Sequence, residues 1–245
     1  MTKIIYLTID DAPSTDCINK LDFLDEHNIK AVWFAEGKRI EEFFDSAVEI
    51  LKRGHIVGNH SYSHPHFSDL SVDDCLTEIT KTHDIVERVY DTANVERQYR
   101  YFRFPYGDKG NSLYGDVKHK PSADGLKRHT VIQSHLKTLG YTQPTWHDIT
   151  YDYMTAFGIF QDVDWFWTYD SRDWCPSFPE TNCEHDTTEK VLARLDEDVS
   201  DDWRGINYQG SAEIFLIHDH VTPDHRFQQV INKLAEKPVV FALPS

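Results

Sequence analysis

The stretch that decides the fold is Lys3–Asp11, KIIYLTIDD, in which an apolar run rich in β-branched and aromatic residues ends in two adjacent aspartates. Such a run predicts a buried strand, because side chains of this kind pack well on a pleated surface. Two charges directly after a buried strand are costly unless a cation or another partner lies beside them. Asp10 and Asp11 are therefore candidate functional residues, although capping of the following helix is the simpler alternative for Asp10.

Strand-like and helix-like segments alternate along the rest of the 245 residues. Besides residues 3–9, the predicted strands are 30–35, 55–58, 100–104, 165–169, 213–217 and 238–243. Helices are predicted at 40–53, 123–139, 187–199 and 224–236, and two more begin at the capping residues Ser14 and Ser71. Repeated strand–helix units predict a parallel sheet in a single α/β domain over residues 1–245, and about seven of them favour a barrel over an open sheet.

One connection departs from this alternation of strands and helices. Residues 107–161 are rich in Gly, Asp, Lys, His and Tyr, with one helical pattern in the middle. A connection of this length is usually functional. We therefore expect an insertion around 107–161 that includes a functional loop.

Charge and hydropathy exclude several classes of partner. The 41 acidic and 25 basic side chains give a net charge of −16, which disfavours binding to nucleic-acid backbones and anionic membrane surfaces. No apolar stretch has the length that a bilayer span needs. The sequence has no signal-peptide pattern at its start, so we expect a cytoplasmic protein, or an exported one from which a leader has been removed; the oligomeric state stays open.

The four cysteines leave the compartment open. Cys17 and Cys75 fall within helical patterns, where a buried free thiol is the usual outcome. Cys175 and Cys183 flank a proline-containing loop and either form a small disulfide or, together with His185, bind a metal.

Unusual polar residues gather at the ends of the predicted strands. They are Asp10, Asp11, His60, Arg103, Asp170, Asp173 and His218. In parallel α/β folds the C-terminal ends of the strands form one rim, so these groups are expected to converge in space. For His218 the alternative is a core histidine that satisfies a backbone carbonyl, but its position at the rim favours a catalytic role.

His60 and His64 are four residues apart, a spacing that puts two imidazoles on one face of a helical turn and lets them bind one metal. Together with a carboxylate they would form a two-histidine, one-carboxylate site with open positions for water and substrate. The same spacing also occurs in ordinary loops. His66 follows Pro65, which turns the chain, so we expect His66 to face solvent or to lie outside the ligand set.

Five short motifs occur in an order that resembles the polysaccharide deacetylases, the NodB-homology group that forms carbohydrate esterase family 4. They are Thr8–Pro13 (TIDDAP), His60–His64 (HSYSH), Arg103–Gly107 (RFPYG), Asp170–Trp174 (DSRDW) and Leu216–Asp219 (LIHD). The resemblance implies a distorted (β/α)7-type barrel and removal of acetyl groups from sugars. It also implies a divalent metal, usually zinc and in some members cobalt or nickel.

The chain departs from the family pattern at three points. Ala12 replaces the usual glycine, Phe104 stands where proline is frequent, and the interval from Arg103 to Asp173 is longer than in compact members. The long interval leaves the fourth motif open. We prefer Asp173 as the partner of His218. The alternatives are Asp152, Asp162, Asp164 and Asp170.

The resemblance also implies a role for each site residue. The metal ligands would be Asp11, His60 and His64. The catalytic group would be Asp10 as base, Arg103 as its anchor, His218 as acid and Asp173 as the partner of His218. The backbone N–H of Tyr106 would stabilise the oxyanion, while Trp174 and Leu216 would enclose the acetyl methyl group or simply pack in the core. Tyr151, Tyr153 and Phe157 are candidates for stacking on sugar rings, although some of them must belong to the core.

The leading functional prediction is a metal-dependent hydrolase that removes acetyl groups from an N-acetylated sugar, a chitooligosaccharide or another glycan that contains N-acetylglucosamine. Cleavage of O-acetyl esters, as in acetylxylan, and hydrolysis of a non-sugar amide are alternatives that use similar machinery. A catalytically inactive carbohydrate-binding barrel is a further alternative, although simple binding would not need Asp10, Arg103 and His218. The expected partner is therefore an acetylated carbohydrate.

Overall fold

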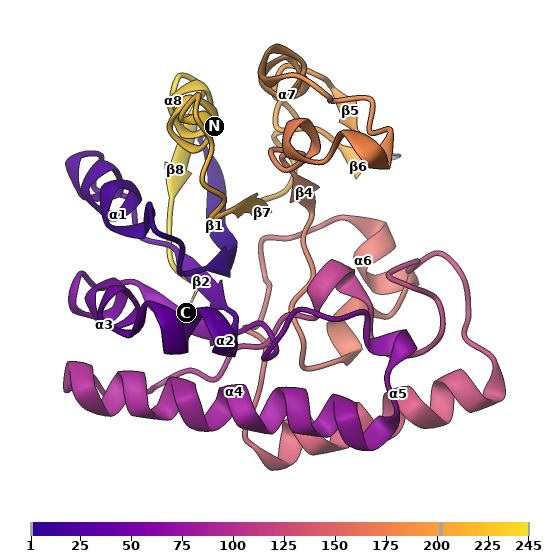
Figure 1. The fold of residues 1–245 in the computed structure, drawn as a ribbon. Helices are drawn as coiled ribbons and strands as arrows, with labels where there is room; N and C mark the ends of the chain where they lie inside the picture. The colour runs from indigo at the N-terminus through magenta and orange to yellow at the C-terminus, as the bar shows by residue number, and fades with distance from the viewer. Residues whose placement is uncertain (1, 201–202, 245) are drawn as a thin grey trace.

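Strand β1 (Lys3–Ala12) lies at the centre of a parallel sheet in the computed structural model, which describes residues 2–200 and 203–244 (Figure 1). The sheet order is β3 (Ile56–Asn59), β2 (Val32–Ala35), β1, β7 (Glu213–His218) and β4 (Tyr169–Asp170). Strand β8 (Val239–Phe241) pairs with the first residues of β1. Nearly every residue of β1 is buried, as expected for a strand that is covered on both faces.

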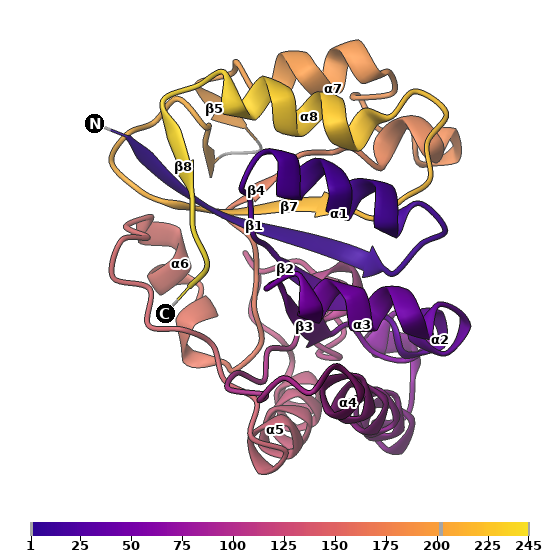
Figure 2. The ribbon, with the colours of Figure 1, turned by 90° about the vertical axis from the view of Figure 1, so that its left-hand side faces the viewer.

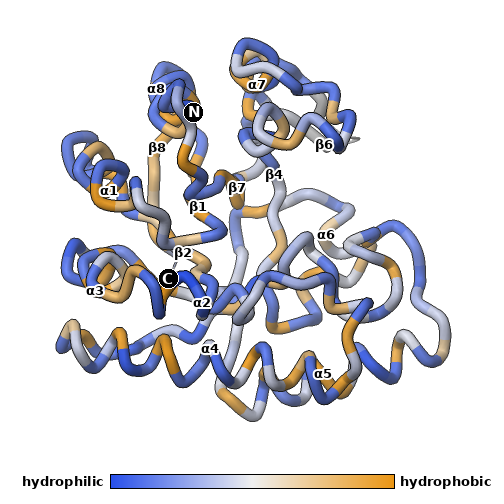
Figure 3. The backbone as a smooth tube through the Cα atoms, viewed as in Figure 1, coloured by the Kyte–Doolittle hydropathy of each residue, from blue (hydrophilic) through white to orange (hydrophobic). Residues whose placement is uncertain are grey.

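Helices cover the outer face of this sheet in one arc, which Figure 2 shows from top to bottom. In order along the arc, each contacting the next, are α7 (Thr188–Arg194), α8 (Arg226–Ala235), α1 (Cys17–Glu26), α3 (Phe44–Lys52), α4 (Val72–Ala93) and α5 (Ala123–Thr138). Apolar residues gather on the strands, while the helices alternate between hydrophobic and hydrophilic residues (Figure 3). This arrangement confirms the predicted α/β architecture of barrel type.

Within residues 2–200 and 203–244, the sheet does not close into a continuous barrel. The predicted strand 100–104 contributes one isolated bridge, between Phe102 and Asn59, and the predicted strand 165–169 is reduced to β4. The Trp165 N–H donates to the Phe102 carbonyl oxygen at 2.8 Å, and the Thr168 N–H donates to the Ile214 carbonyl oxygen at 3.0 Å. One segment therefore crosses from one edge of the sheet to the other, and the ladder stays open there.

The two predicted helix caps have different outcomes. Ser71 caps α4 as predicted, because its Oγ accepts a hydrogen bond from the Asp74 N–H at 3.1 Å. Ser14 does not cap α1, which begins at Cys17. Its Oγ donates instead to Asp219 Oδ1 at 2.8 Å, so the tertiary contact has displaced the local cap.

Other elements differ from the prediction in their bounds. The predicted helix 40–53 is two helices, α2 (Gly37–Glu42) and α3, because Phe43 leaves the helical region between them with φ −124° and ψ 49°. The helix predicted at 187–199 ends at Arg194. A small antiparallel pair, β5 (Val199–Ser200) and β6 (Trp203–Arg204), was not predicted.

The segment 107–161 builds part of the core as well as loops. Helix α5 packs against α4, and its residues Ile132 and Leu136 join Phe67, Phe102 and Phe104 in one apolar cluster. The short helix α6 (Asp152–Ala156) follows later in the same segment. Among the described residues, no helix has both the length and the apolar character needed to cross a membrane.

His55 is a buried histidine away from the rim. The residue is 3 % exposed, and its ring contacts Trp33 edge-on. The Ala31 N–H donates to Nδ1 at 3.1 Å, an interaction that only the neutral ring can accept. Burial, and then the nearby Lys30, lower the pKa of His55 to about 4.

Replacement of His55 by Asn should flatten the pH dependence of stability. The pKa of His55 is lower in the folded state than its ordinary value of 6.5, so its contribution is complete above pH 6.5 and is lost as pH falls toward 4. The wild-type protein should lose up to about 3 kcal/mol across this window through His55. Urea unfolding at several pH values measures the effect, with His27→Asn, at an exposed histidine, as the control. The prediction would be contradicted if the free energy of unfolding changed equally with pH in wild type and in His55→Asn.

Candidate active site

The end of β1 departs from regular strand geometry at its two aspartates. The register with β2 shifts between Ile9 and Ala12, and Asp11 has a left-handed φ of 62°. In a regular strand neighbouring side chains point to opposite faces, but this bulge-like irregularity brings both carboxylates to one histidine. His60 Nε2 lies 3.6 Å from Asp10 Oδ2 and 3.5 Å from Asp11 Oδ1.

Arg103 neutralises Asp10. Its Nη1 donates to Asp10 Oδ1 and to Thr8 Oγ1, both at 2.8 Å, and its guanidinium lies over the Phe34 ring, 4.4 Å from the centroid. Arg103 is fully buried, so water screens the ion pair little, and removal of either partner would leave a buried charge uncompensated. The predicted contact between Arg103 and Asp10 is present.

His60 and His64 face the same carboxylate, but not through a helical turn. Ser61 and His64 have left-handed φ values of 66° and 57°, so the predicted helical geometry is wrong. The chain between the histidines is a loop, and Glu78 holds it by accepting two backbone N–H groups at 2.9 and 2.8 Å. The two rings lie 5.0 Å apart, and His64 Nε2 lies 3.1 Å from Asp11 Oδ1.

The three predicted ligands fit a divalent cation. One oxygen of Asp11 and one ring nitrogen each of His60 and His64 lie within 4.8 Å of one another. Asp11 Oδ1 is buried and accepts no hydrogen bond from the described residues, which is costly for a carboxylate oxygen. Two imidazoles and one carboxylate are a donor set that suits Zn²⁺ and leaves positions for water and substrate.

His60 is oriented by its second ring nitrogen. Nδ1 donates to the backbone carbonyl oxygen of Arg103 at 2.8 Å, which leaves Nε2 of the neutral ring free to bind a metal. Histidine ligands are commonly fixed in this way. Arg103 therefore organises both parts of the site, through its guanidinium and through its carbonyl group.

Opposite charges dominate the titration of this cluster. Burial alone would raise the pKa of Asp11 and lower that of His60, because it disfavours charge. The positive field of His64 instead holds the pKa of Asp11 well below its usual range, and the carboxylates of Asp10 and Asp11 raise the pKa of His60. The site thus favours positive charge, from protons or from a metal that competes with them.

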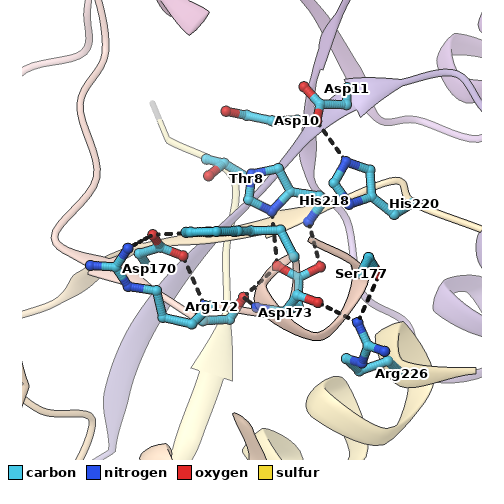
Figure 4. A network of polar contacts seen from close by, with 12 residues as sticks. Thr8, Asp10, Asp11, Asp170, Arg172, Asp173, Ser177, His218, His220 and Arg226 are labelled. Atoms are coloured by element: carbon cyan, nitrogen blue, oxygen red, sulfur yellow. Dashed lines mark hydrogen bonds and ion pairs between the residues drawn. The ribbon is translucent and has the colours of Figure 1, made fainter. Parts of the chain in front are cut away.

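His218 ends β7 and is held by Asp173 (Figure 4). Its Nδ1 lies 2.8 Å from Asp173 Oδ1, and its backbone N–H donates to Asp173 Oδ2 at 3.1 Å. Burial opposes charge on the ring, but Asp173 outweighs burial and raises the pKa of His218 to about 10. The imidazole therefore carries a proton at neutral pH and can donate it.

The alternative partners of His218 lie elsewhere. Asp162 and Asp164 contact Lys109 Nζ at 2.7 and 3.2 Å. Asp152 is exposed in α6. Asp170 accepts a hydrogen bond from the Arg172 N–H at 2.8 Å. The geometry therefore favours Asp173 among the five aspartates.

The three residues predicted to bind substrate have different surroundings. Tyr106 has a left-handed φ of 57° in a tight turn, and its exposed ring contacts His64 edge-on at 4.5 Å. Trp174 is half-buried, and its Nε1 donates to Asp170 at 3.5 Å. Leu216 is buried in β7. Their roles toward substrate stay predictions.

The sequence analysis missed His220. Its Nε2 lies 2.8 Å from Asp11 Oδ2, the oxygen that the other two histidines do not contact, and its ring stacks beside His218 at 5.1 Å. Asp219, between the two histidines, is buried against Lys20 Nζ at 2.5 Å. The alternation His-Asp-His at a strand end was the available signal, because alternate side chains share a face.

A sequence model described as polysaccharide deacetylase matches residues 1–120. Over this region, a little under half of the 245 residues, the chain is similar to the polysaccharide deacetylase family. The matched residues include the predicted metal ligands and both members of the buried ion pair. They are Asp10, Asp11, His60, His64 and Arg103.

Two curated relatives carry related names. The peptidoglycan-N-acetylglucosamine deacetylase of Bacillus cereus is 36% identical over 105 residues, which are 42% of this chain and 36% of the relative. The chitooligosaccharide deacetylase of Rhizobium leguminosarum bv. trifolii is 31% identical over 98 residues, 40% of this chain and 46% of the relative. The chain therefore spans less than half the length of either relative.

A solved carbohydrate esterase structure matches almost the whole chain. The family 4 carbohydrate esterase from Streptomyces lividans, in complex with acetate, has a TM-score of 0.60 and 19% identity, and the match covers 99% of this chain and 93% of that chain. A likeness at this identity concerns the fold alone. The arrangement of strands and helices is thus the one that the family resemblance implied, with the open ladder as a departure from a closed barrel.

A disulfide encloses the loop after Asp173. Cys175 and Cys183 are bonded, with 5.7 Å between their Cα atoms, which confirms the first of the two predicted fates. Arg226 Nη1 donates to the Asp173 carbonyl oxygen at 2.6 Å and to Ser177 Oγ at 3.2 Å (Figure 4). Cys17 and Cys75 are buried free thiols, as predicted.

Replacement of Asp11 by Asn should weaken Zn²⁺ binding by about 100-fold or more, because the cluster loses its anionic ligand. Isothermal titration calorimetry of the metal-free protein measures this affinity. The matched control is Asp10→Asn, which should keep most of the affinity, since Asp10 is bound by Arg103. A larger loss in Asp10→Asn than in Asp11→Asn would reverse the proposed roles of the two aspartates.

Proposed function

We propose that the protein is a metal-dependent hydrolase that removes acetyl groups from an N-acetylated sugar. The observation that carries this proposal is the pairing of Asp10 and His218 across the ladder of β1 and β7, beside the cluster that fits a metal. A base and an acid flanking a metal set are what hydrolysis of an acetamide needs. The family match and the activities named for the two relatives support the same function.

Each residue of the site has a role in this reaction. A divalent cation bound by Asp11, His60 and His64 would supply Lewis-acid chemistry toward water and the acetyl carbonyl group. Asp10 takes a proton from the attacking water. As the C–N bond breaks, His218 donates a proton to the leaving nitrogen, so that the products are acetate and the free amino sugar.

Two further residues keep the base and the acid in the correct state. Arg103 fixes Asp10 in place through the 2.8 Å contact. Asp173 orients His218 and stabilises its protonated form. A protonated acid favours amide over ester cleavage, because an amine leaves only when it has been protonated.

The purified protein loaded with Zn²⁺, Co²⁺ or Ni²⁺ should release acetate from N-acetylglucosamine oligomers, and a chelator should stop the release. Asp10→Asn should lower kcat by about 100- to 10,000-fold while the metal stays bound. An enzyme-coupled acetate assay with parallel metal analysis measures both. Acetate from acetylxylan alone would make the protein an esterase, and no acetate from any N- or O-acetylated sugar would contradict the hydrolase function.

The pH profile should report the pair of His218 and Asp173. Activity requires protonated His218, so kcat should fall at high pH, as the pH rises through the pKa of this residue. Asp173→Asn removes the charge that raises this pKa, so the alkaline limb should move to lower pH by about one unit or more. Asp152→Asn, at an exposed aspartate, is the control. An unchanged alkaline limb in Asp173→Asn would exclude His218 as the acid held by Asp173.

A further inference from the structure

The aromatic residues of 107–161 that the sequence offered for sugar stacking lie mostly away from the site. Tyr151 is buried, and its hydroxyl donates to Glu213, which begins β7, whereas His218 ends that strand. Tyr153 stacks on Tyr151 with 5.4 Å between ring centroids. Tyr151 is therefore one of the residues that belong to the core, and Tyr153 packs against the same core cluster.

Three other aromatic rings form a series of contacts that begins at the proposed metal ligand His64. Tyr106 and Tyr114 have 52% and 53% relative exposure. The His66 ring lies between them. It stacks on the Tyr106 ring with 4.0 Å between ring centroids and lies edge-on to the Tyr114 ring with 5.5 Å between centroids. We call His66, Tyr106 and Tyr114 the aromatic surface.

The aromatic surface is continuous with the candidate active site. Tyr106 contacts His64, one of the proposed metal ligands, at 4.5 Å. From there the surface extends outward through His66 to Tyr114. A molecule that places one unit at the metal cluster would therefore meet these rings with its next unit.

Buried and surface carboxylates fix the aromatic surface in place. Asp108 is fully buried, and its Oδ1 accepts from Ser68 Oγ at 2.6 Å, while its Oδ2 lies 3.3 Å from His66 Nδ1. The Tyr114 hydroxyl donates to Asp69 Oδ1 at 2.6 Å. Rings that are already held lose little conformational freedom when a ligand binds.

Tyr114 comes from the predicted insertion, and Gly115 brings it to the surface. A Cβ at Gly115 would lie 2.4 Å from the Tyr106 carbonyl oxygen, and the φ of Gly115 is +85°. Both facts mean that a side chain there would strain the backbone and force the neighbouring chain to shift. The insertion therefore rests directly on the backbone of the RFPYG motif.

We propose that the aromatic surface binds the sugar unit next to the one that is deacetylated, and that Tyr114 makes the enzyme prefer oligosaccharides to single acetylated sugars. This inference rests on the proposed function. Aromatic faces supply apolar contact to the C–H face of a sugar ring, and a carboxylate such as Asp69 accepts its hydroxyl groups. The net charge of −16 favours a neutral, chitin-type chain over an anionic one.

The test compares substrates of different length in matched variants. kcat and KM are measured with N-acetylglucosamine, its dimer and its tetramer. Wild type should prefer the tetramer, and Tyr114→Ala should raise the KM for the tetramer by about fivefold to tenfold, with a much smaller change for the monomer. Tyr114→Phe keeps the ring and should keep most of the preference.

Two more variants separate the aromatic surface from general effects. Gly115→Ala should reduce the tetramer preference as well, because it displaces Tyr114 without removing a ring. Tyr99→Ala removes another exposed tyrosine, which stacks on Tyr101. This variant should change neither kcat nor KM for the monomer or the tetramer. Thermal unfolding checks that each variant is folded.

The failure of this inference differs from the failure of the proposed function. Equal changes for monomer and tetramer in Tyr114→Ala, or no change for either, would overturn the role of the aromatic surface while leaving the hydrolase intact. A wild-type protein that releases no acetate would reject the function itself. In that case, isothermal titration calorimetry measures the affinity of the tetramer for the inactive Asp10→Asn variant and for the double variant that also carries Tyr114→Ala. Equal affinities would overturn the role of the aromatic surface in binding.

Discussion

Two carboxylates on adjacent residues at the end of the central strand impose the constraint around which the site is organised. Asp10 and Asp11 both approach His60 in a region that water barely reaches, where like charges repel strongly. Each needs its own positive partner. Arg103 serves Asp10, and imidazoles serve Asp11. Because these partners follow different strands, the charges are balanced only when the parallel strands end together at one rim.

That rim is the part of the site that the sequence could predict. Asp10, His60, Arg103 and His218 each follow an apolar run, and parallel strands bring such positions together whatever the details of the loops. The choice of Asp173 needed the structure, because its distance from the ladder is set by the long segment before it. His220 was missed because Asp11 contacts it only after the strand has become irregular.

The fold, like the site, was predictable only in part. Apolar periodicity located β1, β2, β3 and β7, since these strands are buried on both faces. It failed for residues 100–104 and 165–169, which are apolar because they are buried but which form few ladder hydrogen bonds. Burial leaves a signal in the sequence, whereas pairing depends on where the neighbouring chain lies.

Several strained backbone positions lie where the chemistry is. Asp11, Ser61, His64 and Tyr106 all have left-handed φ values, and none of them is glycine. Such conformations cost energy and persist only when surrounding contacts fix them; here the carboxylate of Glu78 holds the histidine loop. This also explains why the helical turn predicted for His60 and His64 failed, since propensity describes relaxed backbones.

The contact at Gly115 suggests that the short stretch around Tyr114 is exchangeable. It meets the RFPYG motif through main-chain atoms and a residue without a side chain, whereas α5 is tied to the motif by the packing of Ile132 and Leu136 with Phe104. Stretches of other lengths could be grafted between the motif and α5 if they keep a glycine at this point. This part of the rim could then be re-engineered separately from the acid, base and metal ligands.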